Sequence, residues 1–214
     1  MVATVVSDGV ATHGATWQAS LHSALISIFS GVILGVAYAV VCACRSLSTM
    51  IDVFCCDVVE HLHLREVAHV WNLTQAVLRK ASMSMDNLLL ALCTLLVFTV
   101  PLLLIDIGFL GNRGVPVTTF LPAALVSCGI LYAIVMAAAL SDKCERVPPL
   151  VNAISFGIGT DVARQRIVDY ISSSAAGFYV LGVRLTAITV AKFTYAWCIV
   201  AVGMLANVVS TDST

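Results

Sequence analysis

The chain has 214 residues, of which 60% are hydrophobic and only 11% are charged, with a formal net charge of −1. A soluble domain has roughly 25% charged residues, so this composition excludes that class and indicates an integral membrane protein. The near-zero net charge and the lack of a long basic run exclude a nucleic-acid partner.

Residues 1–20 contain neither Lys nor Arg and no continuous apolar core, so they do not resemble a signal peptide. We expect them to form an extracellular segment ahead of a membrane domain over residues 21–214. A first span is predicted at about 24–44, where the sequence is uncharged until Arg45. Its Gly31-x-x-x-Gly35 spacing suits close helix packing.

Residues 45–86 contain no Gly or Pro, and apolar residues recur there at helical spacing among charged ones. This pattern predicts amphipathic helix outside the membrane. A single rod would be on the order of 60 Å long, so two helical extensions of the flanking spans are expected. The turn between them falls at 46–49 or at 57–61.

A second span is predicted at about 87–110, with a kink at Pro101 and with Asp106 near its far end. The loop from Gly111 to Pro116 turns the chain into a third span at about 117–140. We favour an interfacial position for Asp106, because a carboxylate at the bilayer centre is costly.

Residues 141–159 contain Pro148, Pro149, Gly157 and Gly159, which predict a long loop. Asp161 is a suitable N-cap for a short helix that ends near Ser174. The apolar residues expected to share one face of this helix are Val162, Ile167, Val168 and Ile171.

The last apolar run extends from Gly177 to Val209 and predicts a fourth span at about 178–209. Lys192 is its charged residue between Leu185 and Val209, and a helix starting near Gly177 would put it close to mid-membrane. A stripe of mostly small residues follows one face, formed by Ala191, Thr194, Cys198, Ala201 and Leu205. Such a stripe suits close helix packing or the wall of a pore.

The order Ala175-Ala176-Gly177-Phe178-Tyr179, Leu181, an apolar run and then Phe193-Thr194-Tyr195 resembles the final span of the arthropod gustatory receptor family. In that family a Gly-Phe-Phe element lies at the cytosolic mouth of the last helix, and a Thr-Tyr pair lies within it. The family pattern continues with Gln-Phe, where this chain has Ala201-Val202.

The resemblance implies a seven-span, ligand-gated cation channel that assembles as a homo- or hetero-tetramer and senses small-molecule tastants. This chain would correspond to the four-span C-terminal portion, as a partial or truncated chain. By resemblance the pore-lining residues are Thr194, Tyr195, Cys198 and Ala201, and a tastant pocket is expected near Phe29 and Phe120. No cofactor or metal is implied.

Orientation follows from the cations, because Lys and Arg are retained on the cytosolic side. Segments 45–86 and 141–177 contain eight of them and the loop between the second and third spans contains one, Arg113. Both long segments are therefore expected in the cytosol, with the C-terminus outside a plasma membrane. The sequon at Asn72 should then stay unmodified.

The sequence also bears on a metal site, on palmitoylation and on catalysis. His61 and His63 point to different helix faces, so a metal site with Cys55 and Cys56 is not expected. Cys42 and Cys44 suit either palmitoylation or plain packing, and the latter is favoured. No span pairs a nucleophile with a base, which argues against an enzyme. The alternative is a four-span scaffold or transporter subunit without a channel of its own.

Overall fold

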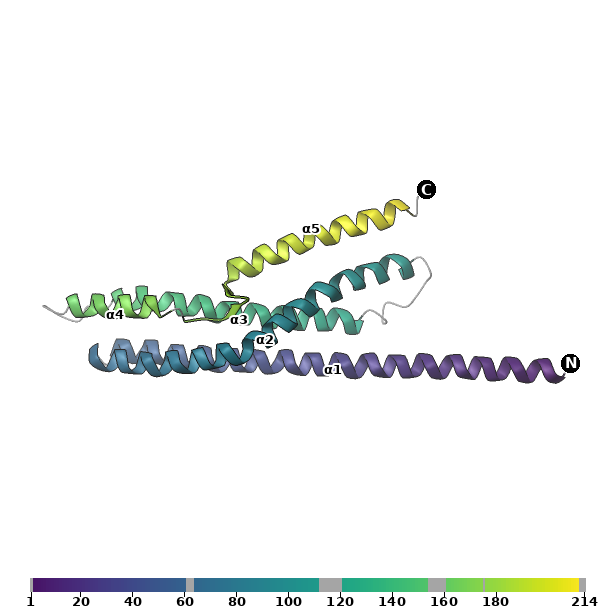
Figure 1. The fold of residues 1–214 in the computed structure, drawn as a ribbon, viewed down its shortest axis with the longest axis horizontal. Coiled ribbons are helices and arrows are strands. Elements are labelled where there is room, and N and C mark those ends of the chain that lie inside the picture. The colour runs from purple at the N-terminus through teal and green to yellow at the C-terminus, as the bar shows by residue number, and fades with distance from the viewer. Residues whose placement is uncertain (1, 61–63, 112–120, 154–160, 175, 212–214) are drawn as a thin grey trace.

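The computed structural model of the protein is almost entirely helical (Figure 1) and describes residues 2–60, 64–111, 121–153, 161–174 and 176–211. Its helices are α1 (Val2–Glu60), α2 (Leu64–Gly111), α3 (Leu121–Ala153), α4 (Asp161–Ser173) and α5 (Ala187–Thr211). Strands β1 (Tyr179–Val180) and β2 (Val183–Arg184) form an antiparallel hairpin just before α5.

The helices lie lengthwise, and α3 packs along α1 in the most extensive contact of the molecule (Figure 1). The end of α1, the start of α2, the end of α3 and all of α4 gather at one end. The start of α1 and the end of α5 lie at the opposite end (Figure 1). From the hairpin, α5 runs towards that terminal end and diverges from α3 (Figure 1).

Part of the buried core lies in the segments expected outside the membrane. Trp71 of α2 is fully buried and its ring centroid is 5.1 Å from that of Phe54 on α1. Val151 of α3 and Ile171 of α4 are buried in the same cluster. The same cluster continues into the predicted third span, where Ile130 is buried.

Three helices are long and apolar enough to cross a membrane, within the described ranges Ala24–Glu60, Glu66–Pro101 and Leu121–Ala153. Only 17%, 22% and 44% of their most apolar windows are buried inside the molecule. Apolar surface of this extent needs a nonpolar surrounding, as in a multi-pass membrane protein. α5 is apolar from Ala187 to Gly203, a shorter stretch of described residues.

A turn at residues 46–49 is wrong, since α1 continues unbroken through them and on through residues 57–60 of the other predicted position. Every third or fourth residue of α1 from Cys44 to Val58 is buried, which holds this part helical against α3. Residues 45–60 and 64–86 are thus helical and continuous with the apolar stretches of α1 and α2. His61 and His63 are outside the described residues.

The loop predicted at residues 141–159 is wrong over 141–153, because α3 continues through Pro148 and Pro149 to Ala153. Residues 154–159 lie outside the described part of the chain. Each proline removes one helical hydrogen bond. Cys144, Val147 and Val151 are nevertheless buried at helical spacing on the face of α3 that packs inward. This burial outweighs the local preference of the prolines.

Two smaller predictions also differ from the structure. Val162 is exposed at the start of α4, whereas Ile171 is buried, so the four apolar residues of α4 do not share one buried face. A Cβ added at Gly31 or Gly35 meets no described atom within 4 Å. The close helix approach occurs instead at Gly129 of α3, where an added Cβ would lie 2.7 Å from Leu34 Cδ2.

Candidate functional site between α1, α3 and α5

The hairpin sets where α5 begins. Leu181 and Gly182 have φ angles of 52° and 76°, and positive values at both residues are what a two-residue type I′ turn requires. Val180 pairs with Val183, and Tyr179 pairs with Arg184. The Leu185 N–H donates a hydrogen bond to the Phe178 carbonyl at 2.9 Å, which closes the base of the hairpin. The Phe178 side chain is fully buried.

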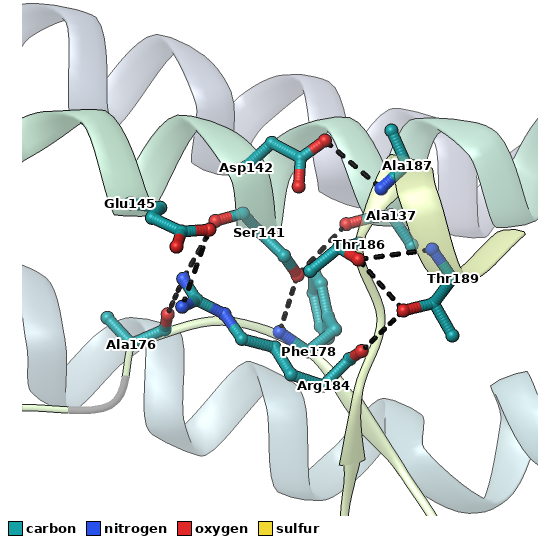
Figure 2. Close-up of polar contacts among 10 residues, drawn as sticks. All are labelled: Ala137, Ser141, Asp142, Glu145, Ala176, Phe178, Arg184, Thr186, Ala187 and Thr189. Carbon is teal, nitrogen blue, oxygen red and sulfur yellow. Dashed lines mark hydrogen bonds and ion pairs between the residues drawn. The ribbon is translucent and has the colours of Figure 1, made fainter. Parts of the chain in front are cut away.

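Ser141 of α3 anchors this hairpin. Its Oγ donates to the Ala137 carbonyl at 3.3 Å and accepts the Phe178 N–H at 2.9 Å (Figure 2). Ser141 is fully buried, so this backbone donor has a protein partner where water is excluded.

Arg184 links Ser141 of α3 to the segment that precedes the hairpin. Its Nη2 donates to the Ser141 carbonyl at 2.9 Å and to the Ala176 carbonyl at 3.0 Å (Figure 2). Nη1 lies 3.8 Å from Glu145 Oε2. A Cβ at Gly177, where φ is 148°, would come within 3.1 Å of Arg184 Nε, so the glycine leaves room for the arginine.

Two side chains cap the first turn of α5. Asp142 Oδ2 accepts the Ala187 N–H at 3.1 Å, and Thr186 Oγ1 accepts the Thr189 N–H at 3.2 Å (Figure 2). A carboxylate at a helix N-terminus also interacts favourably with the helix dipole. The start of α5 is thereby fixed to α3 by a tertiary contact.

The span predicted at 178–209 is therefore too long at its start, since residues 179–184 form the hairpin and the helix begins at Ala187. This changes the position of Lys192. It lies five residues into α5, about 8 Å along the axis from Ala187, and not near the middle of the helix. Its side chain is exposed and contacts no described residue through a hydrogen bond or ion pair.

A cleft of about 760 Å³ lies between α1, α3 and α5. Its walls are mainly apolar, with Val135 and Met136 from α3 and Val190 and Ala191 from α5. Polar groups gather at the end nearest the hairpin, where Ser48, Asp142, Lys143 and Arg146 line it. Its volume is in the range of cavities that hold small molecules.

The predicted pore-lining residues border two neighbouring cavities. Thr194, which is half-buried, and Cys198, which is exposed, line both the large cleft and a small apolar pocket that includes Leu96 of α2. Of the other two, exposed Tyr195 lines the large cleft and half-buried Ala201 lines the small pocket. The side chain of Leu205, the last residue of the stripe, lies outside the described part.

The open side of α5 contains Ile188, Ile199 and Val202, with exposed fractions of 68%, 56% and 67%. Tyr195, which is 70% exposed, lies at the edge between this side and the cleft. Residues on this side contact little of their own chain. In an assembly, another chain, lipid or water must lie against them.

The other predicted site residues are dispersed. Phe29 is 72% exposed on α1 and lines none of the cavities described above. Phe120 lies outside the described residues, as does the side chain of Asp106. Asn72 is exposed and accepts a hydrogen bond from the Tyr170 hydroxyl.

All eight cysteines are free thiols, with Cys42 exposed and Cys44 buried. Among the residues whose placement is described, His, Cys, Asp and Glu form no cluster of three that could hold a metal ion.

Comparison of the chain with protein-family models, with curated proteins and with solved structures gave no match. The function is therefore argued from the sequence pattern and from the geometry of the α3, hairpin and α5 junction.

The sequence pattern missed the hairpin and the cleft for one reason: an unbroken apolar run was interpreted as one helix. The signals that were present are Gly182 two residues after a Phe-Tyr-Val run, and Thr186 as an N-cap residue. Leu181 has a positive φ, which a leucine rarely adopts, so it gave no turn signal.

Proposed function

We propose that the chain is a subunit of a ligand-gated cation channel of the gustatory receptor type, with α5 beside the ion pathway. The observation that carries this proposal is the order of elements before α5: a short helix α4, then Gly177, then the last apolar helix. The resemblance implies this order. The hairpin between Gly177 and α5 adds a fixed start to the last helix.

The arrangement of the ends supports a membrane orientation with four crossings. Both termini lie at one end, as an even number of crossings requires, and the cation-rich segments lie at the other end (Figure 1). α5 has 25 residues, about 36 Å at the standard rise, which is enough for a hydrocarbon core of about 30 Å. We accordingly propose a plasma-membrane protein with an extracellular C-terminus and cytosolic extensions of α1, α2 and α3.

For the pathway itself we assign the open side of α5. Of the four residues matched by resemblance, Tyr195 lies at the edge of that side, between the cleft and the exposed residues Ile199 and Val202. Ala201 lines the small pocket against the chain's own α2, and Thr194 lies between this pocket and the cleft. A tetrameric arrangement with homologous subunits would place four such sides around one axis.

Whole-cell recording tests the function. Cells that express the chain, alone or with a partner receptor subunit, should show a cation current when a panel of tastants is applied. The Asp142→Ala variant, which loses a cap of α5, should show a reduced current at equal surface expression. A chain that reaches the surface with both termini outside and never conducts under either condition would contradict the channel proposal.

The second candidate is a four-span scaffold or transporter subunit. The half-buried positions of Thr194 and Ala201 favour it, because small residues that pack inside one chain need no pore. A C-terminal epitope tag separates orientation from conduction. Labelling of this tag in unpermeabilised cells supports the proposed topology, and labelling only after permeabilisation, or sugar on Asn72, excludes it.

A further inference from the structure

We propose that the cleft between α1, α3 and α5 binds an anionic phospholipid, with its phosphate at Arg146 and an acyl chain along α3 towards Leu131. This site is independent of channel activity. It requires only that the chain lies in a bilayer with its cation-rich end on the cytosolic side.

The apolar wall of the cleft has the length of one leaflet. Its apolar lining residues on α3 run from Leu131 to Leu140, a separation of nine positions that spans about 14 Å. Half of a hydrocarbon core of about 30 Å is about 15 Å. An acyl chain beside this wall would end near mid-membrane, and its headgroup would lie at the polar end of the cleft.

Among the charged residues at the polar end of the cleft, one cation has no partner in the described part of the chain. Lys143 Nζ lies 2.6 Å from Asp52 Oδ2 and 2.7 Å from Ser48 Oγ, so its charge is matched by α1. Asp142 accepts a hydrogen bond from the Ala187 N–H. Arg146 is exposed, lines the cleft and has no hydrogen bond or ion pair to any residue that the structure describes.

A free guanidinium suits a phosphate, because its planar N–H donors match two phosphate oxygens. The membrane side agrees with this choice of ligand. The proposed orientation puts Arg146 at the cytosolic leaflet, which contains the anionic lipids of the plasma membrane. A zwitterionic lipid offers the same acyl chain with less net charge and should bind more weakly.

The test uses the full chain in nanodiscs made of equal parts phosphatidylserine and phosphatidylcholine, with co-purified lipid measured by native mass spectrometry. Wild-type protein should retain phosphatidylserine preferentially. Arg146→Gln should lower this preference about fivefold, which corresponds to about 1 kcal/mol for one cation near the surface. Arg166→Gln removes an exposed cation from α4 instead and should change nothing.

Two variants fill the cleft from opposite walls. If one of them misfolds, the other still tests whether lipid occupies the cleft. Ala139→Phe acts from α3 and Ala191→Phe acts from α5, and both alanines are exposed to the cleft. Each should abolish retention of both lipids while the midpoint of thermal unfolding in detergent stays close to that of wild type.

Three results would overturn the proposal. Equal retention of the two lipids by wild type would mean that Arg146 does not select a headgroup. Identical retention by Arg146→Gln and Arg166→Gln would have the same meaning. Unchanged lipid retention in the two phenylalanine variants, together with loss of the oligomer, would show that a second copy of the chain occupies the cleft.

Discussion

Asp142 of α3 accepts a hydrogen bond from the backbone N–H of Ala187, the first residue of α5, at 3.1 Å. These residues are 45 positions apart in the chain. Because this carboxylate caps a helix that is not its own, the position of the last helix depends on the surface of α3.

Asp142→Ala removes this cap and should lower the free energy of unfolding by about 1 kcal/mol, a typical value for loss of an N-cap. Asp142→Asn keeps a capping oxygen and should lower the free energy of unfolding by less. Thermal unfolding of the purified protein in detergent measures both. Asp169→Asn, an exposed carboxylate on α4, is the matched control, and an equal effect at Asp169 would remove the role assigned to Asp142.

Ser141→Ala should leave the Phe178 N–H buried without an acceptor. The expected cost is about 1–3 kcal/mol, which is the range for a buried unsatisfied donor. Ser172→Ala removes an exposed hydroxyl that bonds only within its own helix and should cost little. Hydrogen exchange of the Phe178 amide gives a second readout, and unchanged protection of this amide in Ser141→Ala would contradict the contact.

Gly177→Ala and Gly182→Ala form a matched pair. Both glycines have positive φ angles, so each substitution strains the backbone by about 1 kcal/mol or more. Only at Gly177 does the new Cβ also crowd Arg184 Nε and Ser141 Oγ, at 3.1 and 3.3 Å. Gly177→Ala should therefore lower the unfolding midpoint further, and equal midpoints would show that the Arg184 contacts tolerate a methyl group.

Lys192→Gln should raise the cation current through an assembled channel, and Lys192→Glu should raise it further. The lysine is exposed near the start of α5, and a positive charge at the mouth of a cation pathway repels the permeant ion. Single-channel conductance at low ionic strength is the measurement, since salt screens the charge. Conductance that is independent of residue 192 would place the lysine away from the ions.

The long helices and their extensions could be predicted from the sequence, because apolar periodicity and the lack of Gly and Pro are strong signals over tens of residues. The course of α3 beyond Leu140 could not be predicted, since local proline chemistry argued for a loop and only the burial of Val147 and Val151 decides otherwise.

At the candidate site, the sequence indicated that Thr194, Tyr195, Cys198 and Ala201 belong to one helix. Which cavities they line was not predictable, because this depends on where α5 starts and how it leaves α3. Both are set by tertiary contacts of Ser141, Asp142 and Arg184, which have no short-range pattern.

The most direct test of the central claim, that the open side of α5 borders water in the assembled protein, is labelling with a charged, membrane-impermeant thiol reagent. The native cysteines are first replaced by alanine, and single cysteines are placed at Ile199, at Tyr195 and, as the buried control, at Val190. Rapid modification at residues 199 and 195 with none at 190 is the predicted result. Absence of modification at both open-side positions, in a complex that reaches the cell surface, would contradict the claim.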